Sequence, residues 1–525
     1  MAVPSRLRHI LPLLPLAAIA ACAPVGPNHE TPTVPWSPVS WLTGHPAPPA
    51  QPKAPPPSTP TEAAIDPAWW SVFHDDTLTK LESRVASGNL DVQVAGQRLL
   101  ESRAVLGVSQ SALLPMVEGS AAASRQQLSK NGVLSLVGTG ASTVPASNTN
   151  GAGATQNQIF QPFNVFQAGF DATWELDFWG HARRGVESAE AAAAAATEGQ
   201  RGVLLGASAE LARDYIRLRG VQRNLEITQN NLRIAQKSLQ LTQERAAGGV
   251  TTDLDVANAT ALVATISAQL PALEAQRDDL IDAIALLLGE PPQSLTAELA
   301  TQKPIPPVPP KVPVGLPSEL ARRRPDIRQA EAQLHSATAD VGVAVADFYP
   351  RIMLSGSVAL QATQLNLLGN WGNSNTWAIG PTLYLPIFQG GRLHSTLELR
   401  KSQQQEAAIA YRRAVLTAMH EVDTGLTDYA AEQRRRDQLR EAVEQNRHAV
   451  DLAQERYSQG VADFLAVLDA QRNLLAAEQQ LTDSTTLIAT DLVALYKALG
   501  GGWEIALPDQ KAPTATDNSI GNLLE

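Results

Sequence analysis

The heptapeptide Glu244–Val250 (ERAAGGV) recurs 211 residues later as Glu455–Val461 (ERYSQGV). Other residues, among them Gly180 and Gly391, are related by the same offset. Upstream of these glycines the offset becomes 235, so the first copy holds 24 extra residues. Most of them belong to a Gly/Ser/Thr/Asn-rich stretch over 129–158, the composition of an exposed loop. This self-similarity predicts one structural unit present twice in the chain, here called the first and second repeats.

Apolar residues recur every seven positions inside each repeat. In the first repeat they are Leu204, Leu211, Leu218, Leu225, Leu232 and Leu239. In the second repeat the equivalent positions hold Val415, Val422, Tyr429, Val443 and Val450. Heptad spacing is typical of helices that supercoil left-handedly around neighbours. It predicts long helices over 180–246 and 391–457, each followed by a tip turn and a returning helix over 252–288 or 463–499.

Segments of two-residue alternation precede the long helices. They cover roughly 116–127, 162–176, 351–361 and 377–386. One apolar and one polar face is typical of a membrane barrel wall, and about 9–11 residues suffice to cross a bilayer. Because four strands cannot close a barrel and lipid tolerates no open sheet edge, several chains are expected to contribute, and three would supply twelve strands. The alternative is a soluble sheet that caps a helical bundle.

The predicted fold class is therefore mainly α with membrane β: a trimeric, twelve-stranded barrel continued by a coiled-coil α-barrel, with two internal repeats per chain. The predicted divisions are a signal peptide (1–21), a Pro-rich N-terminal segment (22–70), the first repeat (71–289), a Pro-rich linker (290–316), the second repeat (317–500) and a tail (501–525).

The N-terminus has the pattern of a secretory signal. A short basic start precedes the apolar stretch Leu11–Ala21, which is too short to span a bilayer. Small residues then lead into Cys22, the chain's only cysteine, in an order similar to the lipobox of bacterial lipoproteins. The resemblance implies a covalent lipid on Cys22, and Ala23 after it points to the outer membrane. The alternative is a core cysteine beside an ordinary cleavage site.

Composition excludes several classes of function. The 525 residues include 41 basic and 52 acidic side chains, a net charge of −11, which leaves no basic surface for nucleic acid. The sequence has no P-loop, no Gly-x-Ser-x-Gly motif and no metal-spaced histidines among its nine. We therefore expect no enzyme activity, no metal site and no cofactor other than the lipid on Cys22.

Several longer motifs indicate a family. They are Asp66–Phe73, Trp174–Gly180, Leu316–Ile327, Asp347–Arg351 and Leu385–Arg392. Together they resemble signatures of TolC-like outer membrane efflux factors, in the lipoprotein branch that includes OprM and NodT-type proteins. The resemblance implies a homotrimer in the outer membrane with a helical tunnel in the periplasm. It also implies two partners, a periplasmic adaptor and an inner-membrane pump of the resistance-nodulation-division type.

The tips of the long helices are the candidate functional region. Glycine near a helix end can adopt positive φ and close the C-cap, so these turns are structurally plausible in their own right. The resemblance implies in addition that the tips contact the adaptor and that nearby residues hold the tunnel shut. The tip residues concerned are Gly249, Val250, Thr251, Gly460, Val461 and Ala462.

Three residues carry the predicted gate. By resemblance, Asp255 of the first tip accepts a hydrogen bond from Tyr457 of the second, and their separation lets the inner hairpin swing outward. Asp469 is expected to form a three-fold acidic ring in the lumen that favours cations.

The chain departs from the family pattern at two positions of the second tip. Ala466 stands where a second acidic ring is usual, and Ala462 stands where an arginine is usual. Asp463 and Phe464 are candidate substitutes. Phe464 has two interpretations, a hydrophobic constriction in the lumen or a buried packing role.

The function that follows is an exit duct for small toxic compounds, powered by its pump partner. The alternatives are a type I secretion channel, a heavy-metal outlet and a non-conducting coiled-coil lipoprotein. Only four methionines occur, which disfavours the metal outlet, and the strand alternation disfavours a purely structural rod.

Overall fold

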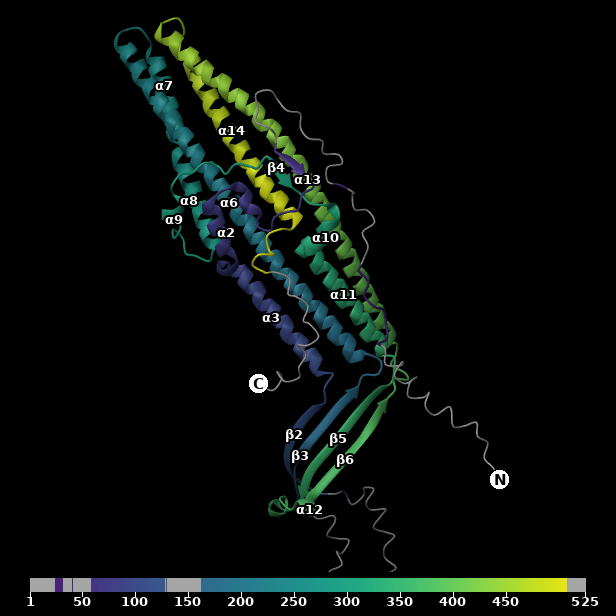
Figure 1. The fold of residues 1–525 in the computed structure, drawn as a ribbon. Helices are drawn as coiled ribbons and strands as arrows, with labels where there is room; N and C mark the ends of the chain where they lie inside the picture. Colours follow the sequence, from purple (N-terminus) through teal and green to yellow (C-terminus); the bar gives the residue numbers. More distant parts are fainter. Residues whose placement is uncertain (1–23, 32–39, 41–57, 128, 130–161, 508–525) are drawn as a thin grey trace, which may run out of the picture. The chain divides into compact units, whose positions relative to one another are not determined.

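The computed structural model describes residues 24–31, 40, 58–127, 129 and 162–507 (Figure 1). The predicted signal peptide, Cys22 and residues 130–158 of the predicted insertion lie outside the described residues. The chain forms two compact units, which are described separately. The sheet unit comprises 1–29, 104–190 and 335–404, and the helical unit comprises 30–103, 191–334 and 405–525.

The two repeats have corresponding elements in the same order. The first contains η1 (Trp69–Phe73), α2 (Asp76–Gly88), α3 (Leu90–Ser111), β2 (Met116–Gln126), β3 (Phe163–Leu176), α6 (His181–Ala247), α7 (Asp253–Ser267) and α8 (Leu270–Leu287). The second contains η2 (Pro317–Glu319), α10 (Leu320–Arg323), α11 (Pro325–Ala346), β5 (Arg351–Ala362), η3 (Leu365–Leu367), α12 (Trp371–Ser374), β6 (Asn375–Tyr384), α13 (Arg392–Ser458) and α14 (Phe464–Leu499). Short elements β1 (Thr59–Thr61), α9 (Thr296–Leu299) and β4 (Lys311–Pro313) complete the described chain.

The sheet unit contains an antiparallel sheet in the order β2-β3-β5-β6. Its strands fall at the four segments whose alternation predicted them. Gly169 of β3 lies so close to β5 that a Cβ there would stand 2.4 Å from the Cβ of Ala359, so only glycine fits. The outer strands β2 and β6 each pair on one side only among the described residues, which leaves two open edges. Trp377 and Ile379 of β6 are 73% and 71% exposed.

Each long helix contains 67 residues, which corresponds to about 100 Å along the helix axis. The heptad positions predicted from the sequence are buried along much of both helices. Leu211 and Leu218 of α6 and Val422 and Tyr429 of α13 belong to one hydrophobic core. The heptad repeat therefore marks the faces on which the helices pack.

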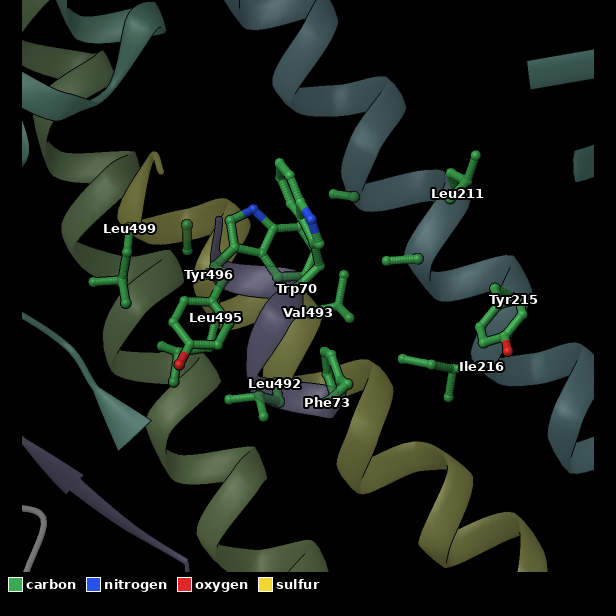
Figure 2. Close-up of a cluster of buried hydrophobic side chains, with 14 of the residues drawn as sticks. Trp70, Phe73, Leu211, Tyr215, Ile216, Leu492, Val493, Leu495, Tyr496 and Leu499 are labelled. Carbon is green, nitrogen blue, oxygen red and sulfur yellow. The ribbon is translucent and has the colours of Figure 1, made fainter. Parts of the chain in front are cut away.

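The core of the helical unit gathers around η1 (Figure 2). Trp69 is fully buried and stacks on Tyr496 of α14, with ring centroids 5.6 Å apart. Trp70 meets Trp69 edge to face at 5.7 Å. The hydroxyl of Tyr215 on α6 donates to Asp75, the residue before α2, at 2.7 Å. Buried aromatic side chains thus join the N-terminal segment to α6 and α14.

The prediction of a single helix over 252–288 was wrong. This segment forms two helices, α7 and α8, separated at 268–269. Pro271 lies at the start of α8. A proline ring has no N–H and clashes with the carbonyl four residues earlier, so it interrupts a helix at this distance. The second repeat has Thr482 at the equivalent position, and α14 runs unbroken for 36 residues.

Candidate functional site

The first tip, residues 245–256, begins with a Schellman turn after α6. The amide of Val250 donates to the carbonyl of Arg245 at 2.9 Å, and that of Gly249 donates to Ala246 at 2.9 Å. Gly249 has φ +70°, in the left-handed region that side chains disfavour. The turn satisfies carbonyls that the helix end leaves without partners.

α7 then begins with a capping box formed by Thr252 and Asp255. The amide of Thr252 donates to the Asp255 carboxylate at 3.2 Å, and the amide of Asp255 donates to the Thr252 hydroxyl at 3.4 Å. The hydroxyl of Thr251 also donates to Asp255, at 2.5 Å, and this bond lowers the pKa of the carboxyl. The carboxylate of Asp255 is thus hydrogen-bonded to residues of its own turn.

The second tip, residues 456–467, lies 211 residues further along the chain and has the same backbone turn as the first tip. The amide of Val461 donates to Arg456 at 2.9 Å, and that of Gly460 donates to Tyr457 at 3.0 Å. Gly460 has φ +74°. This turn is therefore a second Schellman turn, as the repeated sequence implies.

Unlike the first tip, the second tip is packed. Tyr457 is 5% exposed and meets Phe464 edge to face, with centroids 5.5 Å apart. Its hydroxyl donates to Thr242 of α6 at 3.4 Å, and the guanidinium of Arg245 lies 4.6 Å from its ring centroid. Within the described residues of one chain, the predicted hydrogen bond from Tyr457 to Asp255 is not formed: the Tyr457 hydroxyl donates to Thr242 of α6, and the Asp255 carboxylate accepts from its own turn.

The remaining predicted residues have different environments. The carboxylate of Asp463 caps α14 by accepting from the amide of Ala466 at 3.2 Å. Phe464 is 2% exposed, which supports the packing interpretation over the luminal one. Asp469 is exposed, and so is Ala466. The predicted adaptor-contacting residues Gly249, Val250, Gly460 and Val461 are exposed, whereas Thr251 and Ala462 are half-buried.

Sequence reasoning missed Arg245 as a site residue. Its guanidinium donates to the carbonyl of Tyr457 at 2.5 Å and to that of Ser458 at 3.3 Å. Its repeat counterpart, Arg456, is exposed. Since both arginines stand in the same motif, the only signal for the asymmetry is the tyrosine at 457, where the first repeat has Ala246.

The described residues hold no group of three or more His, Cys, Asp or Glu side chains placed to bind a metal ion. The contacts of Tyr457 and Ser458 with α6 involve two carbonyls, hydroxyl groups, one guanidinium and one aromatic ring.

The comparisons with known proteins agree with this architecture. The model of the outer membrane efflux protein family matches residues 81–290 and 316–501. The chain therefore belongs to the outer membrane efflux protein family, and the family predicted from the motifs is confirmed.

Individual relatives cover most of the chain. The pyoverdine export outer membrane protein OpmQ of Pseudomonas aeruginosa is 32% identical over 83% of this chain and 87% of its own length. Nodulation protein T of Rhizobium leguminosarum bv. viciae is 30% identical over 86% and 88%. Among solved structures, the outer-membrane channel OprN has a TM-score of 0.80 and 32% identity, with 91% of this chain and 99% of that chain covered.

Proposed function

We propose that the protein is the outer-membrane exit duct of a tripartite efflux pump and conducts small toxic compounds passively. The observation that carries the proposal is a four-stranded sheet with two open edges on a chain that also contains two 67-residue helices. Membership of the outer membrane efflux protein family supports it. OpmQ is named for pyoverdine export and SrpC of Pseudomonas putida for solvent efflux, which suggests small-molecule cargo here too.

In this proposal three chains close one barrel. Lipid leaves no water to satisfy open backbone groups, so β6 of one chain must pair with β2 of the next. The helices also leave apolar surface for neighbouring chains. The segment Asp253–Leu287 has the length and composition of a membrane-crossing helix, yet only 17% of its most apolar window is buried in one chain. Packing between chains would cover this surface in the trimer.

The anchor and the partners complete the proposal. A lipid on Cys22 would hold the N-terminus at the outer membrane, and the helices would extend into the periplasm. The periplasmic adaptor, which connects the duct to a proton-driven inner-membrane pump, would contact the turn residues Gly249, Val250, Thr251, Gly460, Val461 and Ala462. The pump supplies the energy, and the duct supplies a water-filled path.

The gate is proposed at the tips. Opening would move the second tip, with its buried Tyr457 and Phe464, away from α6. Exposed Asp469 would contribute one carboxylate per chain to an acidic ring that favours cations. The variant Asp469→Asn is expected to lower cation selectivity and divalent-cation block, whereas Asp451→Asn, an exposed control on α13, leaves both unchanged.

The decisive experiment is reconstitution of the purified, lipidated protein in planar bilayers together with its oligomeric mass. A trimer with a resting conductance that rises when the tips are altered supports a gated duct. Monomers without conductance would instead support a structural coiled-coil lipoprotein. Complementation of an efflux-deficient strain then tests the cargo: export of small compounds but not of a secreted protein distinguishes the duct from a type I secretion channel.

A further inference from the structure

Arg245 is directed at the end of another helix. Its Nη1 donates to the carbonyls of Tyr457 and Ser458, at 2.5 and 3.3 Å, in the last turn of α13. The last four carbonyls of a helix have no partners within it and carry the negative end of the helix dipole. A guanidinium at this place therefore binds the helix end without needing a carboxylate.

The same guanidinium covers the ring of Tyr457. The distance from its Cζ to the ring centroid is 4.6 Å, and the tyrosine is 5% exposed, so the contact is largely shielded from water. Nη2 also lies 3.7 Å from the position that a Cβ on Gly460 would occupy, which places the guanidinium beneath the turn. Thr242, one helical turn earlier on α6, accepts from the tyrosine hydroxyl. α6 thus contacts the backbone, the ring and the hydroxyl of one residue.

We propose that Arg245 is the positioning residue that holds the second tip against α6 in the closed duct. The inference rests on the proposed gate and names the contact that must break when it opens. Movement of α13 away from α6 would separate the guanidinium from both carbonyls and from the ring together. Loss of these contacts in one step makes the closed state a discrete state.

The internal repeat supplies a matched control. Arg456 occupies the equivalent position in the second repeat and is exposed. The first tip has Ala246 in place of Tyr457, so it offers no ring to a cation. Removal of either arginine makes the same chemical change in the same motif, but only Arg245→Ala removes the contact with the other hairpin.

The first measurement is single-channel conductance of the full, lipidated protein in planar bilayers. We expect Arg245→Ala to raise the open probability by about fivefold or more, the size of one shielded cation–π or charge-assisted contact. Arg245→Lys restores part of the closed state, because an ammonium donates to the carbonyls but does not stack as a plane. Arg456→Ala leaves the open probability unchanged. Equal effects of Arg245→Ala and Arg456→Ala would overturn the proposal.

A second measurement separates this proposal from the duct itself. Nitroxide labels at V250C and V461C, both exposed, report the distance between the tips by double electron–electron resonance. We expect Arg245→Ala to lengthen or broaden that distance distribution, and Arg456→Ala to leave it as in the parent. If Arg245→Ala changes the distance between the tips but no variant conducts, the role of Arg245 stands and the proposed duct is refuted. If Arg245→Ala leaves the distance between the tips unchanged, the proposed role of Arg245 is refuted, whatever the conductance.

Discussion

The turn after α6 and the turn after α13 have the same three backbone hydrogen bonds, at positions 211 residues apart. Among the equivalent places where their side chains differ, Ala246 and Asp253 of the first tip correspond to the aromatic residues Tyr457 and Phe464 of the second. The first tip is consequently a solvated turn, whereas the second is packed against α6. The same backbone turn therefore occurs once in a solvated and once in a packed environment, and the two aromatic side chains belong to the packed one.

The largest expected effect tests that pair of side chains. Phe464→Ala removes a buried ring and should lower the free energy of local unfolding at the second tip by about 3–5 kcal/mol. Asp253→Ala at the equivalent place removes only a first-turn charge, for a loss of about 0.3–1 kcal/mol. Amide hydrogen exchange of the two tips measures both. Similar losses at the two tips would show that the second is no more packed than the first.

The second test exchanges the helix interruption between repeats. Thr482→Pro places in α14 a proline equivalent to the one between α7 and α8. We expect it to lower the free energy of unfolding by about 3 kcal/mol, because α14 has no break there to accommodate it. The reverse change, Pro271→Thr, should extend the helix across 268–269 at little cost. Hydrogen exchange across both segments measures the result. Equal tolerance of proline in the two helices would contradict the difference.

Some features of the fold follow from the sequence at particular residues. Heptad positions such as Leu211 and Val422 are buried, because a periodic apolar face requires a partner wherever it occurs. The break before α8 was not predicted, although Pro271 inside the predicted helix is a sequence signal for it. The predicted Asp255–Tyr457 pair is not formed within one chain, where Asp255 belongs to a capping box that the residue-by-residue transfer did not consider.

The contact of Arg245 had no sequence signal of its own. Arg245 and Arg456 occupy the same position in one repeated motif, and a linear pattern does not say which of two hairpins packs onto the other. That choice depends on side chains brought together across 212 positions of the chain. Tertiary packing decides it.

The third test uses a carboxyl group that only the second repeat has. Burial raises the pKa of Asp491 to about 6, with help from the nearby charges of Asp428 and Glu432. Its equivalent in the first repeat is Leu280. Since the folded pKa is above the ordinary value of 3.8, the protonated form stabilises the fold, and this contribution is lost as pH rises through about 6.

Asp491→Asn should therefore be more stable than the parent by about 1–2 kcal/mol near pH 8, after allowance for solvent screening, and equal to it near pH 4. Thermal unfolding followed by circular dichroism in detergent at both pH values measures the difference. Asp483→Asn, at an exposed position on the same helix, is the control for removal of a surface carboxylate. A variant that gains nothing at high pH would mean that Asp491 is solvated in the assembled protein.

The smallest expected effect tests the feature that the tips share. Gly249 and Gly460 have φ of +70° and +74°, so alanine at either place should cost about 1 kcal/mol of local stability through backbone strain. The extra methyl group meets open space at Gly249 and lies 3.7 Å from Nη2 of Arg245 at Gly460, an ordinary contact. Equal losses by hydrogen exchange would show that the backbone turns are independent of side-chain packing. A loss at Gly460 several times larger than that at Gly249 would instead mean that the guanidinium beneath the turn is itself held rigidly, which makes the backbone of the second tip part of the closed contact.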